Sequence, residues 1–260
     1  MTVLGLGGTG VIGRQVVAAL LRDGQDVRVG SRGGDGVAAA PGVAVDVLTG
    51  DGLAEALDGI EVLVDLSHAP SLRRRTAQRF VGEGTLRLLA AAREAHVEHV
   101  VGLSVVGIDG VPYPYYEAKV AQERAWASGG LPWSVLRATQ VHEFPGQVLA
   151  TGSMGPLALV PEMRTQPIAS SELALALAEV VEAGPSGRVR DLVGPQQESL
   201  LDMTRRRVAA LGGPRLVVPL RVPGAAGRAM RGGALLGDAT ARRGHLTYEQ
   251  WLDDQECSAR

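Results

Sequence analysis

The sequence has few of the residues that build disulfide-bonded, cysteine–metal or membrane-spanning proteins. Cys257 is the single cysteine among 260 residues, so neither an intrachain disulfide nor a cysteine metal cluster can form. All apolar runs are shorter than the roughly 20 residues that a membrane span needs, and no basic segment precedes the first of them. We therefore expect a soluble, cytoplasmic protein with no membrane partner.

An excess of charge of one sign is also missing. Lys and Arg together number 26 against 28 Asp and Glu, the formal net charge is −2, and the basic residues are scattered along the chain. This distribution provides no electrostatic footprint for nucleic acid. Aromatic residues make up only 3% of the chain whereas hydrophobic residues make up 45%, so the core is expected to be mainly aliphatic.

Strand-like and helical patterns alternate in the first half of the chain. Apolar strand-like runs occupy Thr2–Leu6, Asp26–Val29, Val43–Val47, Glu61–Asp65, His99–Val106 and Trp133–Arg137. Helical patterns lie between most of them, at Val11–Arg22, Thr85–Ala95 and Ala118–Ala127. Strands that alternate with helices predict an α/β protein with a doubly wound, Rossmann-type parallel sheet.

The pattern loosens after Arg137, where Pro and Gly become frequent. Ser170-Ser171-Glu172 offers a helix N-cap ahead of the apolar run 173–181. We therefore predict a nucleotide-binding core over residues 1–137 and a small C-terminal substrate-binding lobe over residues 138–260. The lobe is mostly aliphatic, which favours a small or medium-sized lipophilic substrate.

A glycine-rich segment, GLGGTGVIG, joins the first strand to the first helix. Gly7, Gly10 and Gly13 are spaced GxxGxxG, which permits a tight turn and a close approach of the backbone to a pyrophosphate at a helix N-terminus. Chance is the alternative, because glycine is common in this chain, but the position between a strand and a helix argues against it. We predict a dinucleotide site here that also includes Thr9, Val11 and Ile12.

The end of the second strand bears on the choice between NAD and NADP. An NAD site usually has a carboxylate at this point, but the strand continues into Ser31-Arg32. A guanidinium can pair with a 2′-phosphate and a hydroxyl can donate to it, so NADPH is favoured over NADH. Asp46, at the end of the third strand, is placed either to bind the adenine or to cap its own loop.

Lys119 is the only lysine, and the other 25 basic side chains are arginine. It lies four residues after Tyr115, so one helical face would carry both. A nearby ammonium lowers the pKa of a phenol and can also bind ribose hydroxyls, two tasks that a guanidinium would not perform equally well. The alternative is an exposed lysine paired with Glu123. We predict that Tyr115 and Lys119 are catalytic.

The glycine turn, Ser104 on the fifth strand and the motif YYEAK together resemble the short-chain dehydrogenase/reductase superfamily. The segments RATQ (137–140), GPQQESLLDMTRR and LTYEQWL are similar to its atypical, NmrA-like branch. The resemblance implies a pyrophosphate site at the glycines, a 2′-phosphate site at Arg32 and a proton donor at Tyr115. It also implies that Lys119 binds the nicotinamide ribose and that Ser104 binds the substrate carbonyl.

Several candidates keep a second interpretation. Val105 and Val106 follow Ser104 where the superfamily often has small residues, so the serine side chain could point away from the substrate. Ser67 and His68 follow the fourth strand and either contact the cofactor and substrate or belong to a plain loop. His142 either binds substrate or makes a structural hydrogen bond. No spacing of His, Asp or Glu indicates a metal site.

The expected activity is reduction of a carbonyl or enone by hydride transfer from NADPH, with Tyr115 as the proton donor. One alternative is a redox sensor that binds NADP(H) without turnover. Another is a redox-neutral epimerase or dehydratase that keeps NADP bound. The expected partner is a small carbonyl compound; a homodimer is common in the superfamily, and the sequence leaves the oligomeric state open.

Overall fold

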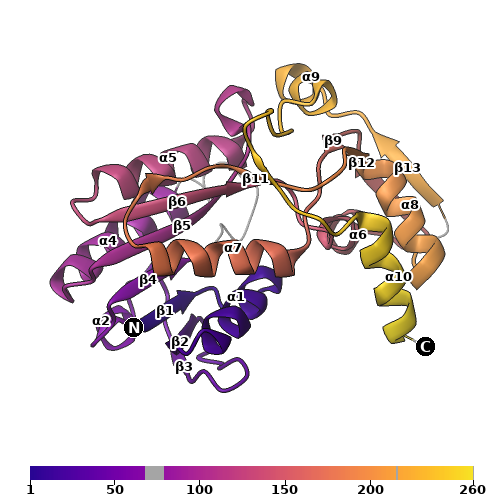
Figure 1. Ribbon diagram of the computed structural model, residues 1–260. Coiled ribbons are helices and arrows are strands. Elements are labelled where there is room, and N and C mark those ends of the chain that lie inside the picture. Colours follow the sequence, from indigo (N-terminus) through magenta and orange to yellow (C-terminus); the bar gives the residue numbers. More distant parts are fainter. Residues whose placement is uncertain (68–78, 215, 260) are drawn as a thin grey trace. The chain divides into compact units, whose positions relative to one another are not determined.

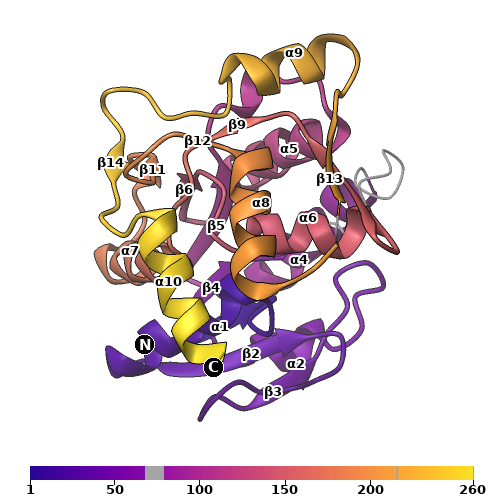
Figure 2. The ribbon, with the colours of Figure 1, turned by 90° about the vertical axis from the view of Figure 1, so that its right-hand side faces the viewer.

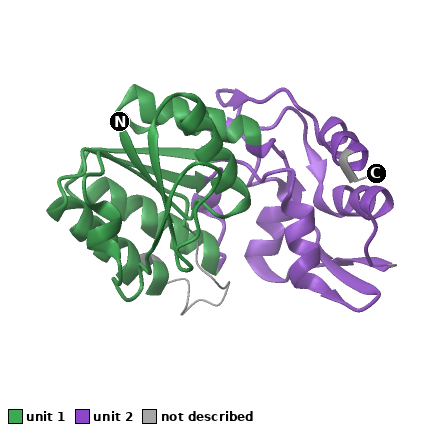
Figure 3. Ribbon diagram, turned by 90° about the horizontal axis from the view of Figure 1, so that it is seen from below, with its two compact units in different colours: residues 1–104, 114–137, 171–189 green, residues 105–113, 138–170, 190–260 purple. Residues whose placement is uncertain are grey.

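The structure is a computed structural model that describes residues 1–67, 79–214 and 216–259. It divides into two compact units, which Figure 3 colours green and purple. The first unit comprises Met1–Ser104, Pro114–Arg137 and Ser171–Val189. The second comprises Val105–Tyr113, Ala138–Ser170 and Arg190–Arg260.

The first unit is built on a parallel sheet. Its strands lie in the order β3 (Gly42–Ala44), β2 (Asp26–Ser31), β1 (Thr2–Leu6), β4 (Val62–Asp65), β5 (His99–Val105) and β6 (Trp133–Ala138), and β10 (Gly187–Arg188) also pairs with β6. The pairs β1–β2, β1–β4, β2–β3, β4–β5 and β6–β10 are all parallel. The strand order reverses between β1 and β4, and such a switch point is where doubly wound sheets bind their ligands. The predicted Rossmann-type fold is confirmed.

Helices cover both faces of this sheet (Figure 1). They are α1 (Val11–Arg22), α2 (Leu53–Leu57), α4 (Thr85–Glu94), α5 (Pro114–Ser128) and α7 (Ser170–Ala183). On one face Leu4 and Leu63 belong to a core cluster that includes Leu57, Leu88 and Trp126 of α2, α4 and α5. On the other face a Cβ at Gly5 would lie 3.7 Å from Val17 of α1. The aliphatic strands therefore form the centre of a three-layer unit.

The helix α5 lies close to the sheet because β5 has a glycine beneath it. A Cβ at Gly102 would lie 2.4 Å from the Trp126 ring, so no larger residue fits there without moving the indole. This approach brings the buried face of α5, which includes Lys119 and Gln122, against the ends of β4 and β5.

The described residues of the second unit form several short sheets and four longer helices. The strands β13 (Leu216–Leu220), β8 (Leu157–Pro161) and β7 (Ser153–Met154) form one sheet, β9 (Arg164–Thr165) pairs with β12 (Glu198–Ser199), and β11 (Leu192–Val193) pairs with β14 (Arg242–Arg243). The helices are α6 (Phe144–Gly152), α8 (Leu200–Leu211), α9 (Gly224–Gly232) and α10 (Tyr248–Ala259). Figure 2 shows α10 beside α8, and the two helices are in contact.

The predicted boundary at residue 137 coincides with one junction between the units, but the chain returns to the first unit at residues 171–189. The assignment of residues 138–260 to substrate binding stays a prediction. Within the described residues, no helix has both the length and the apolar character required to cross a membrane.

Candidate functional site

The glycine turn has the geometry of an open cradle in front of α1. Gly7 has a φ of +79°, and a Cβ there would lie 3.2 Å from the Leu66 carbonyl carbon. A Cβ at Gly13 would lie only 2.3 Å from the Gly7 carbonyl oxygen. Gly10 occupies the N-cap position of α1 without a side-chain cap, so the first amides of this 12-residue helix are free to meet an anion.

Three strand ends meet beside this turn. In the sheet register Leu6 of β1 is the partner of Asp65 of β4, which in turn is the partner of Gly102 of β5. Asp65 is fully buried, and its Oδ1 accepts hydrogen bonds from the Ser67 backbone N–H (3.0 Å) and the Ser67 hydroxyl (2.5 Å). Because a Cβ at Gly7 would lie 3.3 Å from the Ser67 nitrogen, Ser67 lies directly beside the cradle.

The Lys119 ammonium is buried at this junction, and its side chain is only 6% exposed. It donates to the Leu103 carbonyl oxygen (3.0 Å) and to Gln122 Oε1 (2.9 Å), and Gln122 Nε2 donates to Asp65 Oδ2 (3.2 Å). An ammonium has three N–H donors. Within the described part of the chain two of them have a hydrogen-bond partner, and the third is available to a ligand.

Burial acts on both charges of this network. It lowers the pKa of Lys119, an effect that the charges of Asp65 and Glu123 oppose. It also raises the pKa of Asp65, which the hydrogen bonds from Ser67 and the charge of Lys119 oppose. Each group therefore depends on the other to remain ionised.

Tyr115 lies one turn before Lys119 on α5, as the sequence predicts. The residue as a whole is partly exposed, but its phenol group is buried, and its ring makes an edge contact with Tyr116, with centroids 5.6 Å apart. The expectation that Lys119 lowers the pKa of Tyr115 is wrong for this structure, because burial raises that pKa. The physical reason is that the ammonium donates to Leu103 and Gln122 while desolvation of the phenol dominates.

Ser104 is 2% exposed, and its Oγ is a buried hydroxyl without a hydrogen-bond partner in the described structure. Alternate residues of a strand share a face, so Ser104 points to the same side as Gly102, toward α5. An unsatisfied buried hydroxyl calls for an explanation, and a substrate oxygen would provide one. The catalytic role of Ser104 stays a prediction.

The residues predicted to bind the adenosine end lie after β2 and β3. Arg32 is exposed, and Ser31 Oγ accepts a hydrogen bond from the Asp35 backbone N–H (3.2 Å), which leaves its own hydrogen free to be donated. Asp46 Oδ1 accepts from the Leu48 N–H (2.7 Å), the loop-capping interaction that was its second interpretation. Adenine binding by Asp46 stays a prediction.

The two histidines predicted to bind substrate have different outcomes. His68 lies outside the described residues. His142 is completely buried, its Nε2 lies 3.1 Å from the Pro167 carbonyl oxygen, and its ring packs at 5.7 Å from both Tyr248 and Trp251. Because these groups enclose the ring, we assign His142 the structural hydrogen bond and leave it out of the proposed site.

His142 gives a prediction about pH. Burial lowers its pKa to about 4, against about 6.5 in an unfolded chain. The folded protein therefore favours the neutral imidazole of His142. The stability that results from this preference is fully present above pH 6.5 and is lost as the pH falls toward 4. The difference corresponds to about 3 kcal/mol. In His142→Gln, whose amide can still donate to Pro167, this pH-dependent contribution is expected to disappear.

The measurement is urea unfolding of wild type and variant at pH 7.5 and pH 4.5. We expect the difference in unfolding free energy between the two proteins to change with pH. A pH-independent difference between wild type and His142→Gln would contradict the assignment.

Two members of the buried network, Asp65 and Gln122, were not singled out by sequence reasoning. The sequence did contain an indication for Asp65, because it is the one charged residue in the apolar run Val62–Asp65, which is buried as β4. Gln122 is separated from Lys119 by one helical turn, but its bond to Asp65 spans 57 residues and could not be read from spacing.

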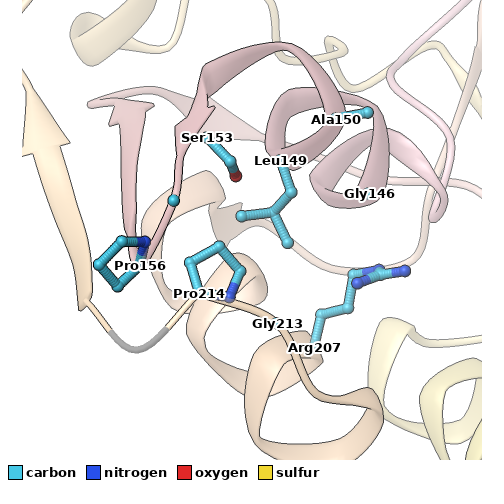
Figure 4. Close-up of a pocket in the computed structure, with 9 residues that line it drawn as sticks. Gly146, Leu149, Ala150, Ser153, Pro156, Arg207, Gly213 and Pro214 are labelled. Carbon is cyan, nitrogen blue, oxygen red and sulfur yellow. The ribbon is translucent and has the colours of Figure 1, made fainter.

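A recess lies within the second unit (Figure 4). It has a volume of about 570 Å³, and its lining includes Leu149, Ser153, Pro156, Arg207 and Pro214. None of the residues predicted from the sequence lines it.

A family model described as NAD(P)H-binding matches residues 7–183. Over 119 residues the chain is 36% identical to sterol demethylase protein B of Methylococcus capsulatus, a match that covers 43% of this chain and 36% of that protein. The chain therefore matches only about a third of the length of this curated relative.

Solved structures with the same fold include enzymes of several activities. A UDP-glucose 4-epimerase from Thermus thermophilus in complex with NAD has a TM-score of 0.70 at 19% identity, covering 98% of this chain and 93% of the other. An NADPH-dependent quinone oxidoreductase from Escherichia coli has a TM-score of 0.68 at 16% identity, covering 98% and 99%. A triphenylmethane reductase from Citrobacter sp. complexed with NADP(H) has a TM-score of 0.64 at 17% identity, covering 98% and 100%.

At such identities the structures establish the fold, and the family model establishes membership. The expected NAD(P) binding is confirmed at the level of the family: the chain belongs to the NAD(P)H-binding family, whose model matches residues 7–183.

Proposed function

We propose that this protein is an NADPH-dependent oxidoreductase that reduces a carbonyl or enone group of a small or medium-sized lipophilic compound. The observation that carries the proposal is the buried ammonium of Lys119 beside the carboxyl ends of β4 and β5, where one of its three N–H donors has no partner among the described residues. A buried cation is costly to maintain, and a charged group with a perturbed pKa at such a place is a candidate functional group.

The residues at the cradle fit the dinucleotide. Gly7 and Gly13 leave space that a Cβ would fill, and the uncapped N-terminus of α1 offers amides to a pyrophosphate. Lys119 would bind the nicotinamide ribose through its free N–H. Ser67, whose hydroxyl donates to Asp65, has lone pairs left to accept a hydrogen bond from the same end of the cofactor.

The cofactor, when bound, supplies the hydride. The chain must supply a proton to the oxygen on which negative charge develops, and Tyr115 is the proposed donor. Its raised pKa keeps the phenol protonated at neutral pH, which suits a donor in the direction of reduction better than a base in the direction of oxidation. Ser104, with its unsatisfied hydroxyl, would hydrogen-bond the substrate oxygen.

The preference for NADPH rests on Arg32 and Ser31. We expect Arg32→Ala to weaken NADPH binding roughly 10- to 100-fold and to leave NADH binding nearly unchanged, because a charge-assisted bond to the 2′-phosphate contributes about 1.5–3 kcal/mol. Fluorescence titration with both cofactors measures this change. The control is Arg22→Ala, at the far end of α1. Equal wild-type affinities for NADPH and NADH would refute the preference.

The alternative functions predict different behaviour of the purified protein. A reductase binds NADPH and consumes it when substrate is added. A redox-neutral epimerase or dehydratase copurifies with NADP and consumes no added NADPH. A sensor binds the cofactor reversibly and turns nothing over. Measuring bound dinucleotide after purification and NADPH consumption with a panel of quinones, enones and ketones therefore tests the proposal against both alternatives. Reversible binding without consumption across the panel would argue against the reductase.

A further inference from the structure

We infer that Asp65 is a positioning residue for Lys119, acting through the Gln122 side chain to hold the ammonium in place and protonated. The network extends from Ser67 through Asp65 and Gln122 to Lys119. The functional meaning of a fixed ammonium rests on the proposed cofactor site, but the inference about the lysine itself does not.

The chemistry of the four groups allows only one direction of hydrogen bonding. An ammonium can only donate, so Gln122 must present its oxygen to Lys119, and a carboxylate can only accept, so the Gln122 nitrogen must face Asp65. The observed distances, 2.9 Å and 3.2 Å, match this arrangement. The other carboxylate oxygen is already held by Ser67, so Asp65 cannot rotate without breaking a bond.

Asp65 is also the main counter-charge of Lys119. The other carboxylate that acts on the ammonium is Glu123. Glu123, however, forms a bidentate ion pair with the Arg137 guanidinium, at 2.8 Å and 2.7 Å. The Arg137 guanidinium therefore largely balances the charge of Glu123, so Asp65 is the carboxylate that compensates the positive charge of Lys119.

Among the described residues, the remaining neighbours of the ammonium are neutral. The Leu103 carbonyl oxygen of β5 accepts one N–H, and the Trp126 ring centroid lies 5.8 Å from Nζ. Tyr115 lies one turn away on the same helix. Removing the charge of Asp65 would thus leave a buried cation with a carbonyl, an amide and a ring, which favours loss of its proton.

The experiment uses the fact that this chain has a single lysine. Protein labelled with ¹³C at the lysine ε-carbon gives one side-chain signal, assigned without mutation, whose pH titration reports the protonation of Lys119. It is recorded on the full chain without added cofactor, so its result is independent of any catalytic activity. We expect the titration midpoint of Asp65→Asn to lie at lower pH than that of wild type. The exposed Glu94→Gln is the control and should leave the midpoint unchanged.

A second variant covers the case in which Asp65→Asn does not fold. Gln122→Met keeps both charges and removes the bridge, so the ammonium is released from its place near Trp126. We expect the ε-signal to move toward the position of a free lysine as the ring-current shift is lost. NADPH binding should weaken about tenfold in both variants, as for loss of one hydrogen bond to a charged group. An unmoved midpoint in Asp65→Asn, or an unmoved signal in Gln122→Met, would overturn the inference. If the lysine signals of the variants change as expected but the wild-type protein does not bind NADPH, the proposed function is refuted and the inference about Lys119 stands.

Discussion

Replacement of Tyr115 by phenylalanine is expected to lower turnover by about 10²–10⁴-fold while leaving NADPH affinity nearly unchanged. The change removes only the phenol O–H, the group proposed to protonate the substrate oxygen. The ring remains and can keep its edge contact with Tyr116. Steady-state rates with a substrate found in the panel, together with NADPH titration, measure the two quantities separately.

Tyr116→Phe is the matched control for this experiment. Tyr116 is the adjacent tyrosine on the same helix, it is buried, and it is not part of the proposed site. Its variant should retain turnover. Because burial raises the pKa of Tyr115, we also expect the phenol to stay protonated and the wild-type rate of reduction to be level through neutral pH. Full activity of Tyr115→Phe would remove this residue from the mechanism.

Replacement of Gly13 by alanine is expected to weaken NADPH binding by roughly 10- to 100-fold, since a displaced turn would lose a hydrogen bond to the charged pyrophosphate, which contributes about 1.5–3 kcal/mol. The new Cβ would lie 2.3 Å from the Gly7 carbonyl oxygen and 2.6 Å from the Gly8 Cα, and both are backbone atoms that can move only with the turn. Overpacking of this kind also lowers stability by about 1–3 kcal/mol.

The control for Gly13 is Gly82→Ala, because a Cβ at Gly82 would meet nothing within 4 Å. Thermal unfolding and NADPH titration of both variants separate loss of binding from loss of fold. Wild-type affinity in Gly13→Ala would show that the turn does not bind the dinucleotide in this geometry.

The sequence was a good guide to local structure in the first unit. The run predicted as the first helix, Val11–Arg22, has the same bounds as α1. The glycine turn fixes where the helix begins, and residues with helical apolar spacing follow it. The third strand is shorter than predicted, Gly42–Ala44 instead of Val43–Val47, because Asp46 accepts the Leu48 N–H and ends the extended backbone. α2 was not predicted, since five residues carry too little periodicity to be recognised.

The sequence was a poorer guide to the surroundings of each side chain. Residue spacing brought Tyr115 and Lys119 to one helical face, but the direction of the Tyr115 pKa depends on burial by groups distant in sequence. The partner of Lys119 was equally out of reach, because the residue that balances its charge lies on β4 and acts through Gln122. His142 was predicted to bind substrate because it follows a strand, but its contacts with Tyr248 and Trp251 show that it belongs to a packed core.

We expect a hydride to pass from NADPH to a small molecule in the presence of this protein. The most direct test is to incubate the protein with NADPH deuterated at C4 of the nicotinamide and a small-molecule extract of its own host, followed by mass spectrometry. We expect a deuterated product that is absent with Tyr115→Phe, and its mass would identify the substrate. Confirmed NADPH binding with no transfer of label to any metabolite would contradict the reductase.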